Sequence, residues 1–372
     1  MKVCLIGPTY PFRGGISHYT TLLCRHLRKT HDVRFYAFKR QYPQWLFPGE
    51  TDKDNSHRVI KADGAVYLLD PLNPLSWWEV FRRAKQLRPD MVILPWWVSF
   101  WTPPFWVIVT LLKIFGRTKI LFICHNVIAH ESNGFDKICS CLVLRKGDYF
   151  IVHSREDAAN LKRMIPAANI RQSSHPTYDV FRTKSLSKDE ARQRLNIVGK
   201  TILFFGFVRP YKGLDYLIDA MPMVIKKMDV TLLIVGEFWK DPEEFKTRAE
   251  ILGIAEKIRI MDRYVPNEEV GLYFAASDLI VLPYVSATGS GIVQVAFGCN
   301  KPVISTKVGC LPEVIADGKT GYLVPPQDSQ AIAQAIIAFY EQAKEAEFVA
   351  NIQRDRGKFS WDKMVETIES FP

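Results

Sequence analysis

A glycine-rich turn in the last third of the chain has the composition of a phosphate site. The segment TGSG at 288–291 follows an apolar run at 279–282 and precedes an apolar segment of helical length. Glycines let backbone N–H groups approach an anion closely, and the first turn of a helix offers unpaired donors at the positive end of its dipole. The turn predicts an anion site, with an ordinary strand-to-helix loop as the alternative.

Two cations follow a second apolar run. The segment GFVRPYKG at 206–213 comes directly after the run 201–205, which places Arg209 and Lys212 at the carboxyl end of an expected strand. Ligands of parallel α/β sheets bind outside these strand ends. Two fixed positive charges there would stabilise the negative charge of a phosphate group.

The C-terminal half resembles the retaining glycosyltransferases of family 4 through these two segments, VGCLPEV at 308–314 and DGKTGYLVP at 317–325. The resemblance implies an α/β protein with the GT-B fold, in which two facing Rossmann-like domains with parallel sheets have a cleft between them. In that family the first two segments hold the diphosphate of a sugar nucleotide. The resemblance therefore implies catalytic roles for Arg209 and Lys212, and donor binding by Gly289, Ser290, Gly291, Ile292 and Gln294.

The acidic pair of that family is missing here. Where the family places two acidic residues eight positions apart around the turn, this chain has Ala287 or Thr288 first and Gln294 near the second position. A Gln amide oxygen accepts a hydrogen bond from a sugar hydroxyl much as a carboxylate does, but more weakly because it is uncharged. We interpret the chain as a subfamily with Gln in place of the pair, and an inactive relative is the alternative. Glu313 is expected to fix its local loop.

A glycine pair precedes the first expected helix. Gly14 and Gly15 follow the apolar run 3–6, and the helix after them is expected to be capped near Ser17. Two glycines before a helix are weak evidence by themselves. The resemblance places this loop beside the donor phosphates and the acceptor.

His125 directly follows the apolar run 120–124, at a strand end. A histidine taken at random is more often structural than catalytic. The resemblance implies that His125 bonds the donor sugar or stabilises positive charge on the anomeric carbon. His130 and Glu131 form a weaker candidate pair, for which the first turn of a helix is the simpler explanation.

Alternating strands and helices must position these residues. Apolar runs typical of buried strands occur at 3–6, 33–38, 91–94, 120–124, 150–152, 202–205, 231–235, 258–261, 279–282 and 303–305. Such alternation indicates parallel sheets. The polar stretch 172–190 predicts an N-terminal acceptor-side domain at 1–175 and a sugar-nucleotide-binding domain at 176–357. By resemblance, 358–372 forms a helix that crosses back to the first domain.

Residues 91–112 contain no charge and could span a bilayer by length alone. Pro95, Pro103 and Pro104 argue against one continuous helix. We expect a strand to Leu94, a tryptophan-rich loop and a helix from Pro104, with a transmembrane helix as the alternative.

Charge and tryptophan are concentrated in the first domain. Residues 1–175 carry 25 Lys plus Arg and 13 Asp plus Glu, a net charge of +12, whereas the remainder is at −2. The first domain also contains the tryptophans Trp45, Trp77, Trp78, Trp96, Trp97, Trp101 and Trp106. Both features suit an anionic membrane surface or a lipid-linked pyrophosphate, and a plain basic surface is the alternative. The sequence contains no motif for nucleic-acid recognition.

Metal and thiol chemistry are not expected. Cys139 and Cys141 are the one close pair among seven cysteines, and their spacing points them apart on a helix. The segment 52–54 resembles metal-holding carboxylates only superficially and is expected to be a solvated loop. We expect no metal site and no cofactor, the sugar nucleotide being a co-substrate.

The resulting hypothesis is a metal-independent retaining glycosyltransferase. It would move a hexose from a sugar nucleotide to a saccharide acceptor, lipid-linked, in surface glycan or polysaccharide synthesis. Its expected location is cytoplasmic, peripheral on the cytoplasmic face of the membrane. The alternatives are a sugar-nucleotide epimerase or phosphorylase of similar architecture, or a non-catalytic partner that binds sugar nucleotides.

Overall fold

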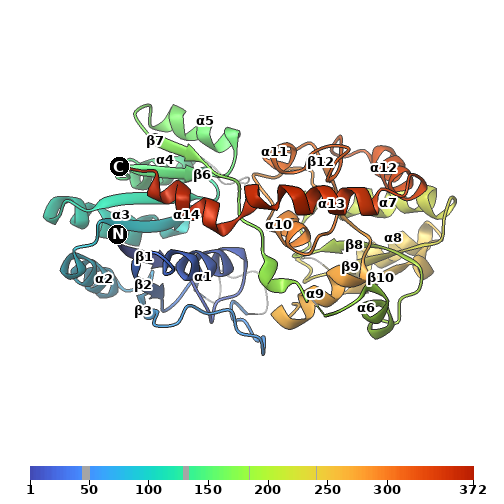
Figure 1. Cartoon of the computed structure of the whole chain (residues 1–372), viewed down its shortest axis with the longest axis horizontal. Coiled ribbons are helices and arrows are strands. Elements are labelled where there is room, and N and C mark those ends of the chain that lie inside the picture. Colours follow the sequence, from blue (N-terminus) through green and yellow to red (C-terminus); the bar gives the residue numbers. More distant parts are fainter. Residues whose placement is uncertain (44–50, 129–133, 184, 240) are drawn as a thin grey trace. The chain divides into compact units, whose positions relative to one another are not determined.

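The computed structural model describes residues 1–43, 51–128, 134–183, 185–239 and 241–372 (Figure 1). The chain forms two compact units. The first contains Met1–Asn55, Val59–Ser174 and Ser360–Pro372, and the second contains Ser56–Arg58 and His175–Phe359. The boundary of the long segments thus falls between Ser174 and His175, and the return to the first unit begins at Ser360.

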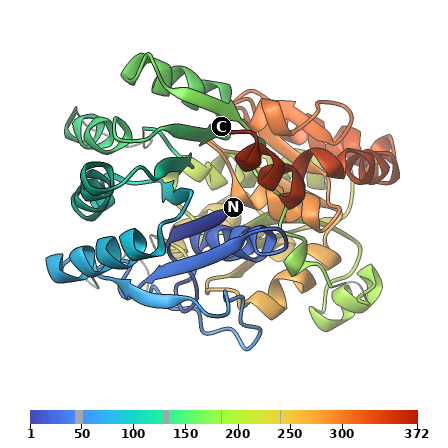
Figure 2. The same ribbon diagram turned by 60° about the vertical axis from the view of Figure 1, so that its left-hand side comes forward.

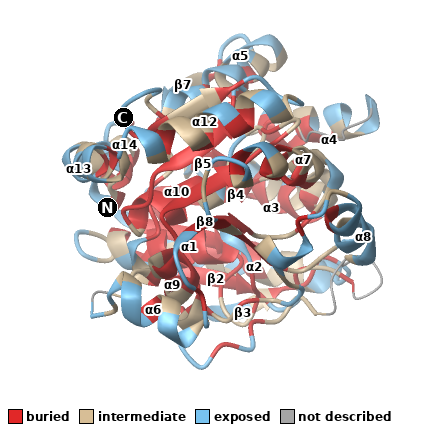
Figure 3. Ribbon diagram, turned by 90° about the vertical axis from the view of Figure 1, so that its right-hand side faces the viewer, coloured by how far each residue is buried: buried red, intermediate tan, exposed pale blue. Residues whose placement is uncertain are grey.

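The first domain is built on a seven-stranded sheet in which every pair of neighbouring strands is parallel. In spatial order its strands are β3 (Val66–Leu69), β2 (Asp32–Phe38), β1 (Lys2–Gly7), β4 (Met91–Trp96), β5 (Lys119–Cys124), β6 (Tyr149–Val152) and β7 (Asn169–Gln172). Strands β4 and β5 are almost wholly buried (Figure 3). Their continuous apolar sequence suits a parallel strand that is covered on both faces.

Helices cover both faces of this sheet. One layer consists of α2 (Pro74–Leu87), α3 (Thr102–Phe115), α4 (Gly134–Leu144) and α5 (Arg155–Met164), which follow one another along the sheet (Figure 2). The other face carries α1 (Gly15–Leu27) and the C-terminal α14 (Trp361–Glu369), which contact each other. Right-handed crossovers explain the division, because the chain moves one way from β1 to β2 and the other way from β3 onward.

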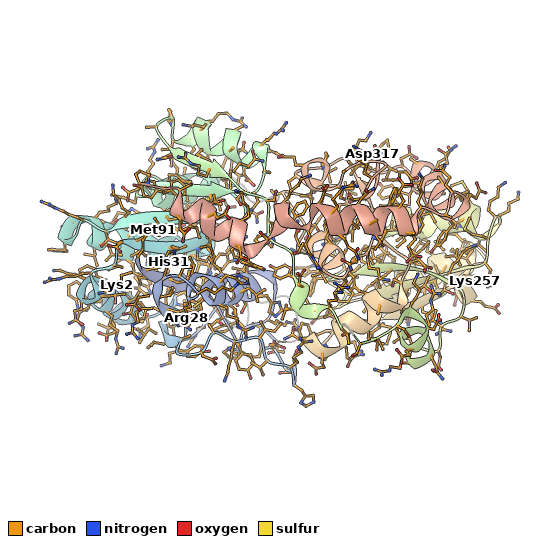
Figure 4. The ribbon with its side chains drawn as sticks, viewed as in Figure 1. Lys2, Arg28, His31, Met91, Lys257 and Asp317 are labelled. Carbon is orange, nitrogen blue, oxygen red and sulfur yellow. The ribbon has the colours of Figure 1, made fainter. Side chains whose placement is uncertain are left out.

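Several side chains of the first domain join α14 to α1 and to the loop after it. The Nε2 atom of His31, labelled in Figure 4, lies 2.9 Å from a carboxylate oxygen of Glu369. Trp361 packs between Tyr19 and His26, at ring-centroid distances of 5.1 and 5.7 Å. The last helix therefore completes the core on this face of the first domain.

The second domain contains a six-stranded sheet, again with all neighbours parallel. Its spatial order is β10 (Ile258–Met261), β9 (Val230–Val235), β8 (Lys200–Phe205), β11 (Leu279–Leu282), β12 (Val303–Thr306) and β13 (Gly321–Val324). Its helices are α6 (Lys188–Arg194), α7 (Leu214–Ile225), α8 (Glu243–Ile251), α9 (Asn267–Ala276), α10 (Gly291–Gly298), α11 (Leu311–Val314), α12 (Ser329–Glu341) and α13 (Glu345–Asp355). The predicted parallel sheets are confirmed.

The uncharged residues 91–112 form a strand, a connecting turn and the start of a helix, as predicted, but the boundaries differ from the predicted ones. The strand β4 runs to Trp96 rather than Leu94, a 3-10 turn follows at Ser99–Trp101, and α3 starts at Thr102 rather than Pro104. Among the described residues, no helix is long and apolar enough to cross a membrane.

Two local predictions were wrong. Helix α1 begins at Gly15 with Gly14 as its N-cap, so Ser17 lies buried inside the helix and caps nothing. The segment 52–54 is not a solvated loop, because Lys53 forms an antiparallel bridge with Phe12 and Asp54 is buried. The N–H of Asp54 donates to the carbonyl of Pro11 at 2.8 Å.

Candidate functional site

Arg209 and Lys212 lie on the loop that leaves β8. Pro210–Lys212 form a single 3-10 turn, which ends at Gly213 in the left-handed region with a φ of 64°. A Cβ atom at Gly213 would lie 2.1 Å from the carbonyl oxygen of Pro283, the residue after β11. Only glycine therefore lets the loops that follow β8 and β11 approach this closely. The close approach brings the two predicted anion-binding segments together.

A buried tyrosine links Lys212 to the glycine-rich turn. The ammonium of Lys212 donates to the hydroxyl of Tyr284 at 2.6 Å, and this hydroxyl lies 3.1 Å from the hydroxyl of Ser290. Burial raises the pKa of Tyr284, so its hydroxyl stays protonated at neutral pH. Because that hydroxyl accepts from Lys212, it can donate to Ser290. Tyr284 is not recognisable as a site residue from the sequence, since an aromatic residue after an apolar strand is typical of a core.

The charges of Arg209 and Lys212 interact with each other. Desolvation lowers the pKa of Lys212, and the positive charge of Arg209 acts in the same direction. The guanidinium of Arg209 lies 4.2 Å from the ring centroid of Trp239, as in a cation–π contact. In the described part of the chain, neither cation forms an ion pair with an acidic side chain. An anion bound nearby would relieve their repulsion.

The glycine-rich turn ends at the N-terminus of α10. Ser290 is the N-cap residue and makes no side-chain cap, and the first turn contains no acidic residue. The turn is braced from behind, where the N–H of Cys310 donates to the carbonyl of Thr288 at 3.0 Å. Gly309 has a φ of 51°, and a Cβ there would lie 1.7 Å from the carbonyl oxygen of Ala287. The first N–H groups of α10 thus offer uncapped donors on a fixed backbone.

Gln294 lies one turn into α10 with its side chain buried. Its Oε1 atom has no hydrogen-bond partner among the described residues, whereas its backbone carbonyl accepts from the N–H of Tyr178 at 3.2 Å. An unsatisfied buried acceptor costs about 1–3 kcal/mol. Most buried polar atoms have a partner, so this atom is consistent with an acceptor role toward a ligand hydroxyl.

His125 follows β5 directly and is half-buried. The backbone N–H of His125 donates to the carbonyl of Trp96 at 2.8 Å. The edge of its ring faces Tyr19 at a centroid distance of 4.5 Å, and His153 lies 5.3 Å away. Because Tyr19 also contacts Trp361, the C-terminal helix supports the side chains that hold His125.

The other predicted residues lie at the start of α1 in the first domain and in α11 in the second domain. Gly14 and Gly15 are exposed at the start of α1, and a Cβ at either would meet no atom within 4 Å. Gly14 is required for its φ of 105° and not for lack of space. Glu313 is exposed in α11, and its backbone N–H donates to the carbonyl of Cys310 at 2.9 Å. His130 and Glu131 lie outside the described residues.

Candidate site residues therefore occur in both domains. In the second domain, Lys212, Tyr284 and Ser290 are joined by hydrogen-bond distances, and Arg209 is close enough to shift the pKa of Lys212. In the first domain, His125 directly follows β5, and the pair Gly14–Gly15 ends the loop that follows β1; β4 lies between these two strands in the sheet. Within the described ranges, no three His, Cys, Asp or Glu side chains gather as metal ligands would.

Two family models match the chain, one in each half. The model of Glycosyltransferase Family 4 matches residues 13–172, and that of Glycosyl transferases group 1 matches residues 199–342. The matches support a glycosyltransferase of the family 4 type. The second match includes Arg209, Lys212 and the turn before α10.

Curated relatives of this glycosyltransferase act on lipid and inositol acceptors by name. The GDP-mannose-dependent alpha-(1-6)-phosphatidylinositol monomannoside mannosyltransferase of Mycolicibacterium smegmatis is 25% identical over 88% of this chain and 85% of the relative. The phosphatidyl-myo-inositol mannosyltransferase of Mycobacterium leprae is 35% identical, but over 38% of this chain and 37% of the relative. The D-inositol 3-phosphate glycosyltransferase of Corynebacterium glutamicum is 26% identical over 69% of this chain and 65% of the relative.

Solved structures establish the fold of this glycosyltransferase. Anabaena Alr3699/HepE in complex with UDP is 18% identical, with a TM-score of 0.76 over 100% of both chains. WaaG, a glycosyltransferase involved in lipopolysaccharide biosynthesis, is 14% identical, with a TM-score of 0.68 over 100% of both chains. Together with two parallel-sheet Rossmann-like domains, these similarities confirm the predicted α/β GT-B class. The predicted cleft between facing domains stays a prediction.

Proposed function

We propose that this glycosyltransferase moves a hexose from a nucleoside diphosphate sugar to a hydroxyl of a lipid-linked saccharide, with retention and without a metal ion. The observation that carries the proposal is the pair Arg209 and Lys212, which has no acidic partner in the described residues. Lys212 is linked to the turn before α10 through Tyr284. The relatives named for phosphatidylinositol and inositol acceptors, and the neighbour bound to UDP, support the substrate classes.

The proposed chemistry needs negative charge to be stabilised on the leaving group. When the bond between the anomeric carbon and the phosphate oxygen breaks, the electron pair stays on the diphosphate. Arg209 and Lys212, with backbone N–H groups of Ser290 to Ile292, would stabilise that charge. The acceptor hydroxyl forms the new bond to the anomeric carbon on the face that the diphosphate leaves, and its proton passes to the departing diphosphate.

The donor sugar needs its own contacts. We assign the Oε1 atom of Gln294 as an acceptor for a donor hydroxyl, because it is buried without a partner in the described part of the chain. We assign His125 to the developing positive charge of the anomeric carbon, and Gly14 and Gly15 to the loop beside the phosphates. These assignments extend the family resemblance residue by residue.

A nucleotide screen followed by product analysis tests the function. Calorimetry with UDP, GDP, ADP and their sugars should show one base bound tightly, and the parent should bind it more tightly than Lys212→Met. The matching sugar nucleotide is then incubated with lipid-linked saccharides and the products are separated. Transfer with the anomeric configuration retained supports the proposal. Conversion of the donor without acceptor indicates an epimerase, a need for free phosphate indicates a phosphorylase, and tight binding without turnover indicates a binding partner.

A further inference from the structure

The outer side of α2 and α3 carries large apolar side chains in solvent. Leu75 is 78% exposed, Trp78 is 52% exposed and Phe115 is 53% exposed. Trp78 contacts Phe81 at a centroid distance of 5.1 Å, and Phe81 contacts Phe115 at 5.9 Å. The helices α2 and α3 also pack together, so these side chains form one continuous surface. A patch of this kind marks an interaction site.

Helix α4 extends the surface. Its core side is formed by Cys139, Val143 and Leu144, yet Phe135, Ile138 and Leu142 are all exposed. The exposed set is spaced by three and four residues, which aligns it on one side of the helix. Because α4 contacts α3, its apolar side continues that of α3, where Trp106 and Ile114 are exposed. Packing onto the sheet explains the apolar residues on the core side of α4 but not those on its exposed side.

A basic groove lies at the C-terminal end of α2. It has a volume of about 690 Å³, and its walls include the aromatic rings of Trp78, Phe81 and Phe115. The cations that line it are Lys2, Arg82, Lys85 and Arg88. Arg82 is paired with Glu79 at 2.8 Å, but the other three cations make no ion pair with described residues. No Asp or Glu is among the described residues that line it.

We propose that the outer surface of α2, α3 and α4 docks on an anionic phospholipid bilayer. Aromatic rings favour the boundary between lipid and water, and the groove cations would meet lipid phosphates beside them. The apolar side chains are spread over three adjacent helices and not gathered in one pocket. That distribution fits a planar apolar layer better than a single peptide. The surface is independent of the glycosyl transfer site.

Only some of the tryptophans and basic residues of the first domain lie on the proposed membrane-docking surface. Trp96 and Trp101 are buried in the core of the first domain, and Trp45 lies outside the described residues. Trp78 and Trp106 are the exposed members of the set. The basic residues are also divided, because Arg25, Arg28 and Lys29 belong to α1 and its C-terminal end on the opposite face of the sheet, whereas Arg82, Arg83, Lys85 and Arg88 belong to α2 and its end.

Vesicle co-sedimentation of the full chain tests the proposal. The parent should bind vesicles of phosphatidylcholine with phosphatidylglycerol, bind phosphatidylcholine alone weakly, and be released by salt. The double variant K85E/R88E should lose at least about 30-fold in affinity, from roughly 1 kcal/mol for each basic residue near an anionic surface. The control K61E/K363E changes the charge equally beside α1 and on α14, breaking ion pairs of 3.9 and 2.9 Å, and should bind like the parent.

The apolar contribution is tested by W78S/F115S, which should leave binding weak and wholly reversed by salt. Far-ultraviolet circular dichroism of each variant checks that the domain is folded. Equal binding by all four proteins, or no binding to either vesicle, would overturn the proposal. A change in the oligomeric state of the free protein on W78S/F115S, seen by sedimentation velocity, would overturn it too, because the surface would then join two copies of the chain.

Discussion

Replacement of Lys212 by Met removes one fixed charge from the proposed diphosphate site and keeps most of the side-chain stem. Two unit charges about 4 Å apart interact by roughly 4 kcal/mol at an effective dielectric constant near 20. Loss of one pre-organised donor in comparable sites costs about 2.7–4 kcal/mol, or two to three orders of magnitude in turnover. We therefore expect Lys212→Met to lower kcat by about 100-fold to 1000-fold.

Folding should be little affected by this change. The hydroxyl of Tyr284 keeps Ser290 as a neighbour at 3.1 Å, so no buried polar atom of the chain described here is stranded. The ammonium is also disfavoured by desolvation, which means that its removal from the free protein has little cost. Lys226→Met, at the exposed C-terminal end of α7, is the matched control and should keep the parent rate.

Tyr284→Phe distinguishes the effect of the Lys212 charge from the effect of the position in which Tyr284 holds it. The variant keeps the ammonium but loses the 2.6 Å hydrogen bond that fixes it, so a fall of about tenfold is expected from one net hydrogen bond. Steady-state kinetics with the identified donor measure all three variants, with circular dichroism as the folding check. A folded Lys212→Met enzyme that turns over like Lys226→Met would refute the assignment of the leaving-group site.

Three further predictions concern other parts of the molecule. Gln294→Ala should raise the KM for the donor more than it lowers kcat, and the reverse pattern in steady-state kinetics would contradict donor binding by its Oε1 atom. Transfer should continue in the presence of a chelator, and loss of turnover that magnesium or manganese restores would contradict the metal-independent mechanism. Burial lowers the pKa of His153 from 6.5 to about 4, so the unfolded chain binds more protons between these values, and His153 alone should contribute a loss of about 2 kcal/mol of stability from pH 7 to pH 5. Urea unfolding should show a smaller loss for His153→Asn, and equal losses would argue against a neutral buried imidazole.

Apolar runs predicted the central strands and the edge strand β10, but not the other edge strands. Strands such as β8 and β11 are buried on both faces. Because every side chain of such a strand packs in the core, its sequence is almost continuously apolar. The strands β3, β7 and β13 were not predicted. β7 has the sequence NIRQ at the edge of its sheet, and β13 includes a glycine and lies at the edge of the other sheet, so neither shows a continuous apolar run.

Some site residues could be recognised from the sequence, and others depend on tertiary contacts. Arg209 and Lys212 could be proposed from their place after a strand, because strand ends have a known relation to ligands. Tyr284 could not, because its role depends on the 2.6 Å contact with Lys212 across two loops that are 72 residues apart. The segment 52–54 was misread for the same reason, since its pairing with residues 11–13 is a tertiary contact.

The position of α14 has a consequence for the order in which the chain folds during synthesis. The first domain takes its last helix from residues 361–369, which a ribosome makes after the whole second domain. Domains generally fold in the order of translation, N-terminal first. Here the side of α1 that packs against Trp361 stays uncovered until residues 361–369 have been made. The nascent first domain therefore exposes this apolar side while the second domain is synthesised, and a chain that stops before residue 361 would leave it exposed.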